Sequence, residues 1–377
     1  MRFVAACFSP LLSVGVLLAQ IPKDLPRSPV IQSISLATPP LTPFPSMGDL
    51  WFTTWAEDDN LYGSWGDGRG PADEKSGPFL SERQIGKSNE SYDNRFDGPT
   101  ALWSWSLVTD CGAVKYTGDP PNLKPTVMRR DSPTQFEPRV DDKPSSFLSI
   151  DGRLYGQFHS PLGDARIGYL AYSDDYGSNW SRVGFFLPGA AKPANASPWT
   201  KEANSNFRCL FFINMGKNYS LNSDGYVYGL GIGKEWNWDN AVYLARVKKA
   251  DILRYQAWEY FTGLDASGKP RWSSVESEAK PVPDLYTPGQ GSAIYHPGMK
   301  RYLFMNQQKL WDAPEPWGPW TVAGDFPSEP PEWQKGYQPG IISKGLGPDS
   351  FWFTIAGQGA PPNISYSFHI GRMVMHR

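Results

Sequence analysis

Glycine and proline interrupt this chain from end to end, with 37 glycines and 36 prolines among its 377 residues. This spacing leaves little room for long helices and favours short strands joined by tight turns. Aromatic residues make up 14% of the sequence, which supplies the large apolar surface of a packed core and argues against disorder. The strand-like segments fall into five groups, at 49–66, 146–187, 208–247, 293–306 and 340–373.

These groups recur roughly every 60 to 80 residues, which is the spacing of four-stranded blades with their loops. The pattern predicts an all-β fold, a five-bladed β-propeller of four-stranded antiparallel blades. We expect residues 47–377 to form it as a single domain, with a short helix only near 249–260. A two-sheet sandwich is the alternative, whereas a stacked β-helix would need shorter and more regular repeats.

The amino-terminal segment has the pattern of an export signal. Met1-Arg2 precedes an apolar stretch that ends at Ala19, which predicts a signal peptide over residues 1–19. A membrane anchor is the alternative, although the stretch is at the short limit for a bilayer span. We expect a Pro-rich segment over 20–46, which forms either a tether or a strand that wraps the edge of the domain. We also expect no later membrane span, and a secreted protein in the extracellular space or the periplasm.

The charge balance and the number of cysteines limit which partners, disulfides and metal sites the sequence supports. The 36 Lys+Arg nearly balance the 38 Asp+Glu, so the sequence gives no support to a nucleic-acid partner. Cys111 and Cys209 remain after signal removal, and whether they pair is open. No Cys/His cluster has zinc spacing, so we expect no cofactor and no dedicated metal site. The sequence leaves open a structural Ca²⁺ at the axis, and we expect a monomer.

Ser173-Asp174-Asp175-Tyr176-Gly177-Ser178-Asn179-Trp180 fits the S-x-D-x-G-x-x-W pattern called an Asp box. The Asp175 side chain can bind the backbone of its own turn, Gly177 can supply a positive φ, and Trp180 can pack beneath. This motif resembles those of sialidases and other propellers, in which its role is structural. We therefore assign Asp175 no catalysis.

Two carboxylates are the leading catalytic candidates. Asp49 opens one strand of the first hairpin and Asp67 closes its antiparallel neighbour, so both meet at the rim opposite the turn. Two carboxyl groups this close separate an acid from a base, and glycosidic cleavage requires such a pair. The alternative interpretation makes Asp49 and Asp67 turn residues and the nearby tryptophans blade core.

Several stretches resemble one family of secreted bacterial propellers catalogued as a domain of unknown function (the DUF4185-type family). The likeness spans nearly the whole mature chain. It includes Asp49-Leu50-Trp51, Thr54-Trp55-Ala56, Gly66-Asp67-Gly68, Lys143-Pro144-Ser145-Ser146, Gly216-Lys217-Asn218-Tyr219, Asp224-Gly225-Tyr226-Val227-Tyr228, Tyr295-His296-Pro297-Gly298 and Ala313-Pro314-Glu315-Pro316-Trp317.

The resemblance implies a fold similar to glycoside hydrolase family 43 and a relation to endo-D-arabinanases. In arabinanase-like members an Asp at the start of the first strand and another in a Gly-Asp step form the expected acid/base pair. Asp49 and Asp67 match these positions, although this chain reads Gly-Asp-Gly where those members read Gly-Asp-Thr.

The sequence therefore favours a secreted glycoside hydrolase that acts on a polysaccharide or another glycan. The alternative is a non-catalytic propeller that binds carbohydrate or a cell surface; a sialidase is disfavoured because no arginine triad is evident. Each further candidate for substrate binding also has a structural interpretation, as a turn, core or ion-pair residue. These candidates are Trp51, Trp55, Lys143, Asn218, Asp224, Tyr295 and Arg301.

Overall fold

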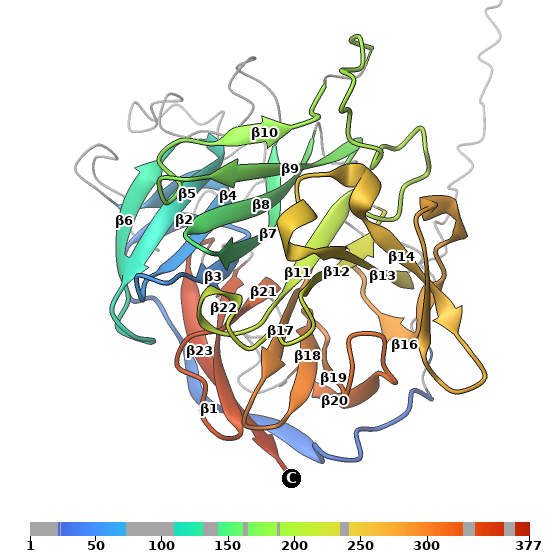
Figure 1. Cartoon of the computed structure of the whole chain (residues 1–377). Coiled ribbons are helices and arrows are strands. Elements are labelled where there is room, and N and C mark those ends of the chain that lie inside the picture. Colours follow the sequence, from blue (N-terminus) through green and yellow to red (C-terminus); the bar gives the residue numbers. More distant parts are fainter. Residues whose placement is uncertain are drawn as a thin grey trace, which may run out of the picture.

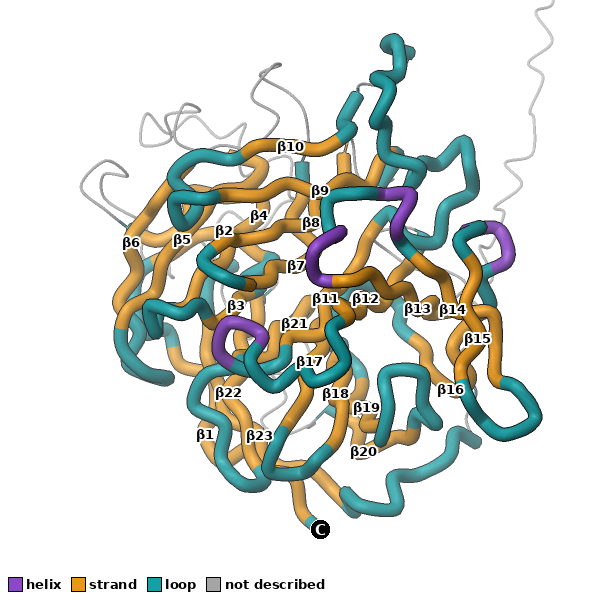
Figure 2. The backbone as a smooth tube through the Cα atoms, in the orientation of Figure 1, coloured by secondary structure: helices purple, strands orange, loops and turns teal. Residues whose placement is uncertain are grey.

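The structure is a computed structural model. It describes residues 22, 24–72, 109–130, 142–160, 165–186, 189–233, 241–326, 336–357 and 366–377. The signal peptide expected over 1–19 lies outside the described residues. The described chain is built of β-strands, with helix limited to single turns (Figures 1 and 2).

Within this described part, the strands form four hydrogen-bonded sheets, and the largest, of ten strands, consists of two antiparallel groups joined by one parallel pairing. The resulting five groups are arranged around a common centre (Figure 1). Blades 2, 4 and 5 have four strands each, the inner strand of blade 1 is split in two, and blade 3 carries additional short strands. Blade 1 contains β2 (Ser46–Asp49), β3 (Thr53–Trp55), β4 (Leu61–Pro71), β5 (Thr109–Thr117) and β6 (Lys124–Arg129). Blade 2 contains β7 (Lys143–Ile150), β8 (Arg153–Ser160), β9 (Ile167–Ser173) and β10 (Ser181–Val183).

The other blades continue in chain order. Blade 3 contains β11 (Cys209–Asn214), β12 (Tyr226–Ile232), β13 (Ala241–Lys248), β14 (Glu259–Leu264), β15 (Pro270–Ser273) and β16 (Pro281–Tyr286). Blade 4 contains β17 (Ser292–His296), β18 (Arg301–Met305), β19 (Lys309–Ala313) and β20 (Thr321–Asp325). Blade 5 contains β21 (Tyr337–Ile342), β22 (Ser350–Ala356), β23 (His369–His376) and β1 (Ser33–Leu41).

The inner strands close a ring around the axis. In this ring β3 contacts β7, β7 contacts β11, β11 contacts β17, β17 contacts β21, and β21 returns to β3. The strand β11 pairs with β17 in parallel, through Ile213 with Ala293 and Asn214 with Ile294. The closed circuit of five inner strands is that of a five-bladed propeller, so the expected fold class is confirmed.

The last blade combines both ends of the described chain. The strand β1 is its outermost strand and pairs antiparallel with β23, with Ser33 opposite His376. The sequence predicted a Pro-rich segment here, with a tether and an edge strand as the two alternatives. The pairing of β1 with the carboxyl-terminal strand joins the first and last described segments, which Figure 1 shows side by side.

Large aromatic side chains fill the space between and within the blades, and glycine makes room for them. Trp65 in β4 is fully buried and lies opposite Gly112 of β5. A Cβ atom at Gly112 would lie 2.2 Å from the Trp65 ring, and one at Gly70 would lie 2.5 Å from it. Both glycines are therefore required for the indole to lie flat in the blade.

A buried polar seam joins the first three blades near the axis. The Thr54 hydroxyl of β3 donates to Asn214 Oδ1 of β11 at 2.7 Å and accepts from the Ser149 amide of β7 at 3.0 Å. Asn214 Nδ2 donates in turn to the Phe147 carbonyl at 3.0 Å. All of these groups are buried, so their mutual hydrogen bonds compensate for the loss of water.

Two turns have the geometry that their residues favour. Asp151 and Gly152 join β7 to β8 with φ values of 53° and 80°, the positive values that a two-residue hairpin turn uses. Between β9 and β10, Asp175 Oδ1 accepts from the Ser173 hydroxyl and the Asn179 amide. Trp180 packs there against Phe147 and Phe158.

The helix expected near 249–260 is instead two 3₁₀ turns, Lys249–Asp251 and Tyr255–Ala257; further 3₁₀ turns lie at Lys217–Tyr219 and Glu276–Glu278. Tertiary contacts explain the difference. The Tyr255 hydroxyl donates to the Val183 carbonyl and accepts from the Leu170 amide, both in blade 2. These bonds fix the connector against its neighbour and override a continuous helix.

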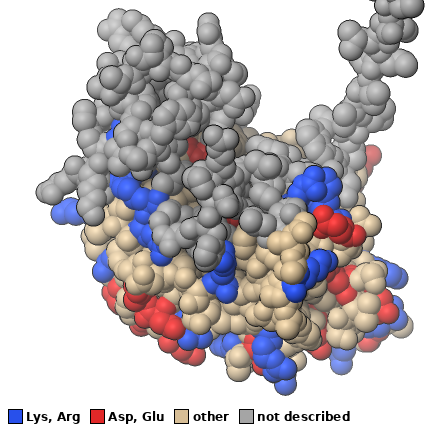
Figure 3. Space-filling model, turned by 90° about the horizontal axis from the view of Figure 1, so that it is seen from above, with Lys and Arg blue, Asp and Glu red and all other residues tan. Residues whose placement is uncertain are grey.

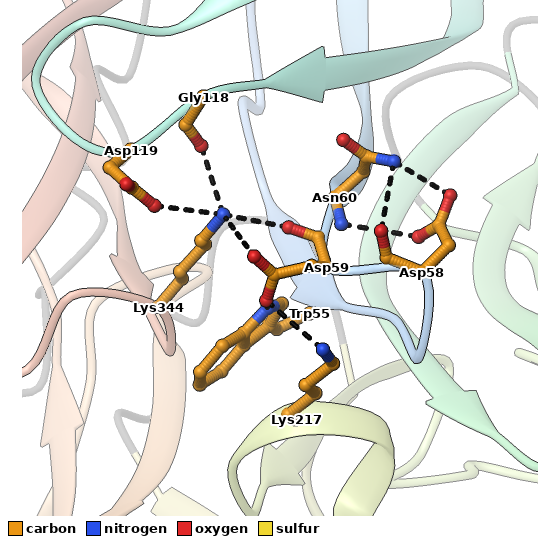
Figure 4. Close-up of polar contacts among 8 residues, drawn as sticks. All are labelled: Trp55, Asp58, Asp59, Asn60, Gly118, Asp119, Lys217 and Lys344. Atoms are coloured by element: carbon orange, nitrogen blue, oxygen red, sulfur yellow. Dashed lines mark hydrogen bonds and ion pairs between the residues drawn. The ribbon is translucent and has the colours of Figure 1, made fainter.

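A network of charged groups lies at the carboxyl-terminal end of the inner strands (Figure 4). Lys344 is 7% exposed, and its ammonium group donates to the carbonyls of Asp59 at 2.7 Å and Gly118 at 3.0 Å. It also pairs with the Asp119 carboxylate at 2.9 Å. Lys217 of blade 3 contacts Oδ1 of the Asp59 carboxylate at 3.1 Å, and this contact lowers the pKa of Asp59. The network therefore links blades 5, 1 and 3.

Candidate functional site

Several buried polar side chains lie near the amino-terminal ends of the inner strands, and we consider one from each blade. Because the inner strands run around one axis, their amino-terminal ends meet at the same end of the propeller. We call these residues the polar ring. It consists of Asp49 at the end of β2, Lys143 at the start of β7, Arg208 just before β11, Gln290 just before β17 and Gln338 in β21.

Asp49 is the buried carboxyl group of this ring. It is 6% exposed, and its Oδ2 accepts a hydrogen bond from the Tyr337 hydroxyl of blade 5 at 2.6 Å. Asp49 lies opposite Gly66 in β4, and a Cβ atom at Gly66 would lie 2.5 Å from Asp49 Oδ1. The absence of a side chain at Gly66 thus makes the space that the carboxyl group occupies.

Asp67 follows Gly66 directly and has a different environment. Its side chain is 22% exposed and forms an ion pair with Lys143 of blade 2, whose side chain is 5% exposed. The backbone at Asp67 has a φ of 42°, in the left-handed region that costs energy for a residue with a side chain. Asp49 and Asp67 therefore lie at the same end of the axis, one buried and one partly exposed.

Other polar groups flank Lys143. His159 of β8 lies opposite Lys143 and is 1% exposed, with its Nδ1 at 2.9 Å from the Ser145 hydroxyl. The Arg208 guanidinium donates to the carbonyls of Ser205 at 3.2 Å and Ala165 at 3.0 Å. Both cationic members of the polar ring are thus bonded to the protein.

The two glutamines of the ring differ from its charged members. Gln290 and Gln338 are each 1% exposed, and neither the amide nitrogen nor the amide oxygen of either has a hydrogen-bond partner among the described residues. Gln338 also has a positive φ of 50°. Buried amides without partners are rare because each lost hydrogen bond costs free energy.

The remaining candidates from the sequence do not join this site. Trp55, Asn218, Asp224 and Tyr295 lie at or beyond the carboxyl-terminal ends of the inner strands. The Trp55 indole donates to Asp59 Oδ1 at 3.1 Å, within the network of Figure 4. Asn218 Oδ1 accepts from the Ser149 hydroxyl at 3.4 Å.

Two candidates have structural partners elsewhere. Trp51 is 1% exposed and packs in the core of blade 1, and its indole donates to the Gly48 carbonyl at 2.9 Å. Arg301 forms a buried ion pair with Asp312 at 2.6 Å. The structure thus groups only Lys143 of the seven binding candidates with Asp49 and Asp67.

Asp224 and Tyr295 lie on an aromatic surface between blades 3 and 4. The Asp224 carboxylate accepts from the Tyr228 hydroxyl at 2.7 Å, and the Tyr228 ring lies 6.4 Å from that of Trp317. Burial raises the pKa of Glu315, and the charge of Asp224 raises it further. The Tyr295 ring lies 5.0 Å from that of Tyr302. This surface is remote along the strands from the polar ring.

Sequence reasoning missed Tyr337, Arg208, Gln290 and Gln338. One signal was available, because a propeller collects the first residues of its inner strands at one end of the axis. The last inner strand was predicted to begin at Gly340, which left Tyr337 and Gln338 outside it. The hydrogen bond from Tyr337 to Asp49 spans 288 residues, and no local pattern encodes it.

The described surface carries charges of both signs. On the face in Figure 3, lysine and arginine side chains are interspersed with aspartate and glutamate. Within the described ranges, no three His, Cys, Asp or Glu side chains are close enough to hold a metal ion. Cys111 and Cys209 are buried in blades 1 and 3, and the structure contains both as thiols. None of the described helices is long and apolar enough to span a membrane.

The ring of blades and the polar strand ends define a β-propeller with a candidate site at one end of its axis. The chain belongs to the family described as "Domain of unknown function (DUF4185)", whose model matches residues 126–343. The expected family is therefore confirmed. No curated protein matches the sequence.

Among solved structures, the chain is similar to the GH43_1 enzyme from Xanthomonas citri complexed with xylose. The two are 12% identical, with 89% of each chain covered and a TM-score of 0.46. It is also similar to a GH43 β-xylosidase/α-arabinofuranosidase from a compost microbial metagenome. That pair is 11% identical, with 90% of this chain and 94% of that one covered and a TM-score of 0.45. No substrate or activity follows from similarities this distant.

Proposed function

We propose that the protein is a secreted glycoside hydrolase that cleaves a glycan at the polar ring, with Asp49 and Asp67 as its carboxylate pair. One observation carries the proposal: two carboxyl groups in unlike surroundings meet where the inner strands begin. Asp49 is buried beside the neutral Tyr337 hydroxyl, and the partly exposed Asp67 is paired with Lys143. Glycosidic cleavage needs one carboxyl group in the acid form and one in the base form.

The surroundings suggest a role for each carboxyl group. An adjacent ammonium group favours the ionised form of a carboxyl, so Lys143 suits Asp67 to activate water or to attack the sugar carbon. Asp49, the buried member of the pair, is then assigned to protonate the leaving oxygen. The positive φ of Asp67 supports this assignment, because strained backbone is concentrated at functional sites.

The test is hydrolysis of a panel of arabinans, galactans and mixed glycans from plants and bacteria. The released reducing ends measure the rate. Asp49→Asn and Asp67→Asn should each lower the rate by about 100-fold or more, since a positioned acid or base contributes that much. Asp174→Asn, an exposed pair with Arg153 on blade 2, is the control and should retain the wild-type rate. Wild-type rates in both active-site variants would contradict the mechanism.

The second candidate function is a non-catalytic propeller that binds a glycan or a cell surface. It is favoured by the fact that both carboxylates have protein partners, Tyr337 and Lys143, as residues with a structural role would. In that case the wild-type protein binds members of the panel without releasing reducing ends. Binding measured by calorimetry alongside hydrolysis separates the two functions.

We also propose export by cleavage of a signal peptide over residues 1–19. The support is the single basic residue followed by an apolar stretch at the start of the chain. Intact-mass measurement of protein recovered outside the cytoplasm should show the loss of about 19 residues. Recovery of the full-length chain in the membrane fraction would contradict this proposal.

A further inference from the structure

Among the described residues with buried polar atoms that lack hydrogen-bond partners, only Gln290 and Gln338 lack them at two side-chain atoms. Each is 1% exposed, yet both polar atoms of each side chain have no hydrogen-bond partner within the described part of the chain. A buried amide has two N–H donors and an acceptor oxygen, and leaving them unbonded destabilises the fold. The two glutamines therefore retain hydrogen-bonding capacity that the folded protein does not use.

A third buried glutamine shows what the fold does when an amide is structural. Gln157 in β8 is fully buried, and its amide nitrogen donates to the carbonyls of Phe158 at 3.0 Å and Arg208 at 2.8 Å. Its oxygen accepts from the Leu210 amide at 3.1 Å. The contrast shows that this propeller bonds a buried amide fully where the amide only supports blade packing.

Gln338 lies in β21, and Gln290 lies two residues before β17, the neighbouring inner strand. The Ile341 amide of β21 donates to the Ser292 hydroxyl of β17 at 3.0 Å, which aligns the two strands. Gln290 precedes Ser292 by two residues, and Gln338 precedes Ile341 by three, so both lie toward the amino-terminal end of the axis. Tyr337, next to Gln338, reaches Asp49. The amides thus belong to the same end of the axis as the two carboxylates.

The chemistry of the ring selects among ligands. An amide donates and accepts at once, as a sugar hydroxyl does, so two neighbouring amides complement adjacent hydroxyl groups. The cations of the ring are already engaged, Lys143 with Asp67 and Arg208 with two backbone carbonyls. The ring therefore matches an uncharged polyhydroxylated ligand better than an anionic one.

We propose that Gln290 and Gln338 bind adjacent hydroxyl groups of a neutral sugar residue in the polar ring. This inference rests on the proposed function for the location of the site, and it adds the class of ligand and the residues that recognise it. The positive φ of Gln338 agrees with such a role, because the strain is maintained where it positions a functional group.

The experiment exploits the missing bonds. Gln290→Met and Gln338→Met keep the side-chain volume and remove the unbonded polar atoms, so each should raise the melting temperature by about 2–4 °C. Gln157→Met is the matched control and should lower it by about 4 °C, because it leaves bonded backbone groups without partners. Calorimetry with L-arabinose, D-galactose, arabinan and galactan should show wild-type binding to at least one probe. That binding should weaken by about tenfold in either ring variant.

Three results would overturn the inference. One is a lower melting temperature in Gln290→Met and Gln338→Met, as in Gln157→Met, which would mean that the amides are bonded in the fold. Another is a higher melting temperature with unchanged sugar affinity, which would mean that they hold only water. The third is a wild-type protein that binds none of the four probes.

These readouts also separate the inference from the proposed function. Weaker sugar binding in the glutamine variants, with no hydrolysis of any glycan by the wild type, would refute the hydrolase and support the sugar site. Loss of hydrolysis in Asp49→Asn and Asp67→Asn, with unchanged affinity and KM in the glutamine variants, would refute the sugar site alone.

Discussion

Replacing Thr54 by valine tests whether hydrogen bonds between blades stabilise the propeller axis. Thr54 is 1% exposed, and its hydroxyl serves the Asn214 side chain of blade 3 and the Ser149 amide of blade 2. Valine has nearly the same shape, so the substitution removes both bonds and leaves a buried acceptor and a buried donor without partners. Because both bonds join separate blades, their loss weakens the ring itself.

The expected magnitude follows from the two orphaned groups. Each costs about 1–3 kcal/mol when left buried and unbonded, and the added apolar methyl offsets part of this, for a net loss of about 3 kcal/mol. Unfolding entropy of about 2.1 cal/mol/K per residue gives about 0.75 kcal/mol/K for a chain of this size. The melting temperature should therefore fall by about 4 °C.

The adjacent residue provides an internal control. Thr53 is 6% exposed, but its hydroxyl has no hydrogen-bond partner in the part of the chain that is described. Thr53→Val should therefore leave the melting temperature unchanged or raise it slightly, and Thr54→Ser should lower it by about 1–2 °C for the lost methyl group. Differential scanning calorimetry on the three variants provides the measurement. Equal melting temperatures for Thr54→Val and Thr53→Val would refute the idea that these hydrogen bonds between blades stabilise the axis.

Three further predictions concern other parts of the fold. Gly66→Ala places a Cβ atom 2.5 Å from Asp49 Oδ1, so glycan hydrolysis should fall much more than stability, which should drop by about 1–3 kcal/mol in urea unfolding. Equal effects on rate and stability would contradict that reasoning. Lys344→Met should cost about 2 kcal/mol and Lys217→Met under about 1 kcal/mol in the same assay, because only Lys344 is buried. A reversed order would show that the network in Figure 4 is not held by Lys344. Burial lowers the pKa of His369 to about 4, so its stabilising contribution is complete above about pH 6.5 and is lost as the pH falls toward 4. The loss at pH 4.5 should be about 2.5 kcal/mol, and a His369→Gln variant with an unchanged pH profile would exclude this histidine as its source.

The fold could be predicted from the sequence where the signals are local. The Asp-Gly pair at 151–152 indicates a tight hairpin, and the structure has positive φ values at both residues. The turn of the first hairpin is also as expected, because β3 ends at Trp55 and its antiparallel partner β4 begins at Leu61. Each of these features depends on the conformational preferences of a few adjacent residues.

The candidate site was less predictable because its parts come from distant segments. The four side chains at its centre come from three blades: Asp49 and Asp67 from blade 1, Tyr337 from blade 5 and Lys143 from blade 2. The bond between Asp49 and Tyr337 spans 288 residues. The direction of the strand also determines which end of the axis a residue reaches. Trp55 follows Asp49 by six residues, which is up to about 20 Å of extended chain, so an aromatic residue close in sequence lies at the opposite end.

The two ends of the axis differ in how their buried amide side chains are bonded. At the carboxyl-terminal end, Lys344 has four oxygen contacts, and Thr54 and Asn214 bond to each other. At the amino-terminal end, Gln290 and Gln338 are buried without partners among the described residues. Unsatisfied amides lower stability, and a ligand that supplies the missing bonds accounts for their retention at this end. Substitutions at the first end should therefore change stability without changing sugar affinity, whereas substitutions of the two glutamines should raise stability and weaken binding.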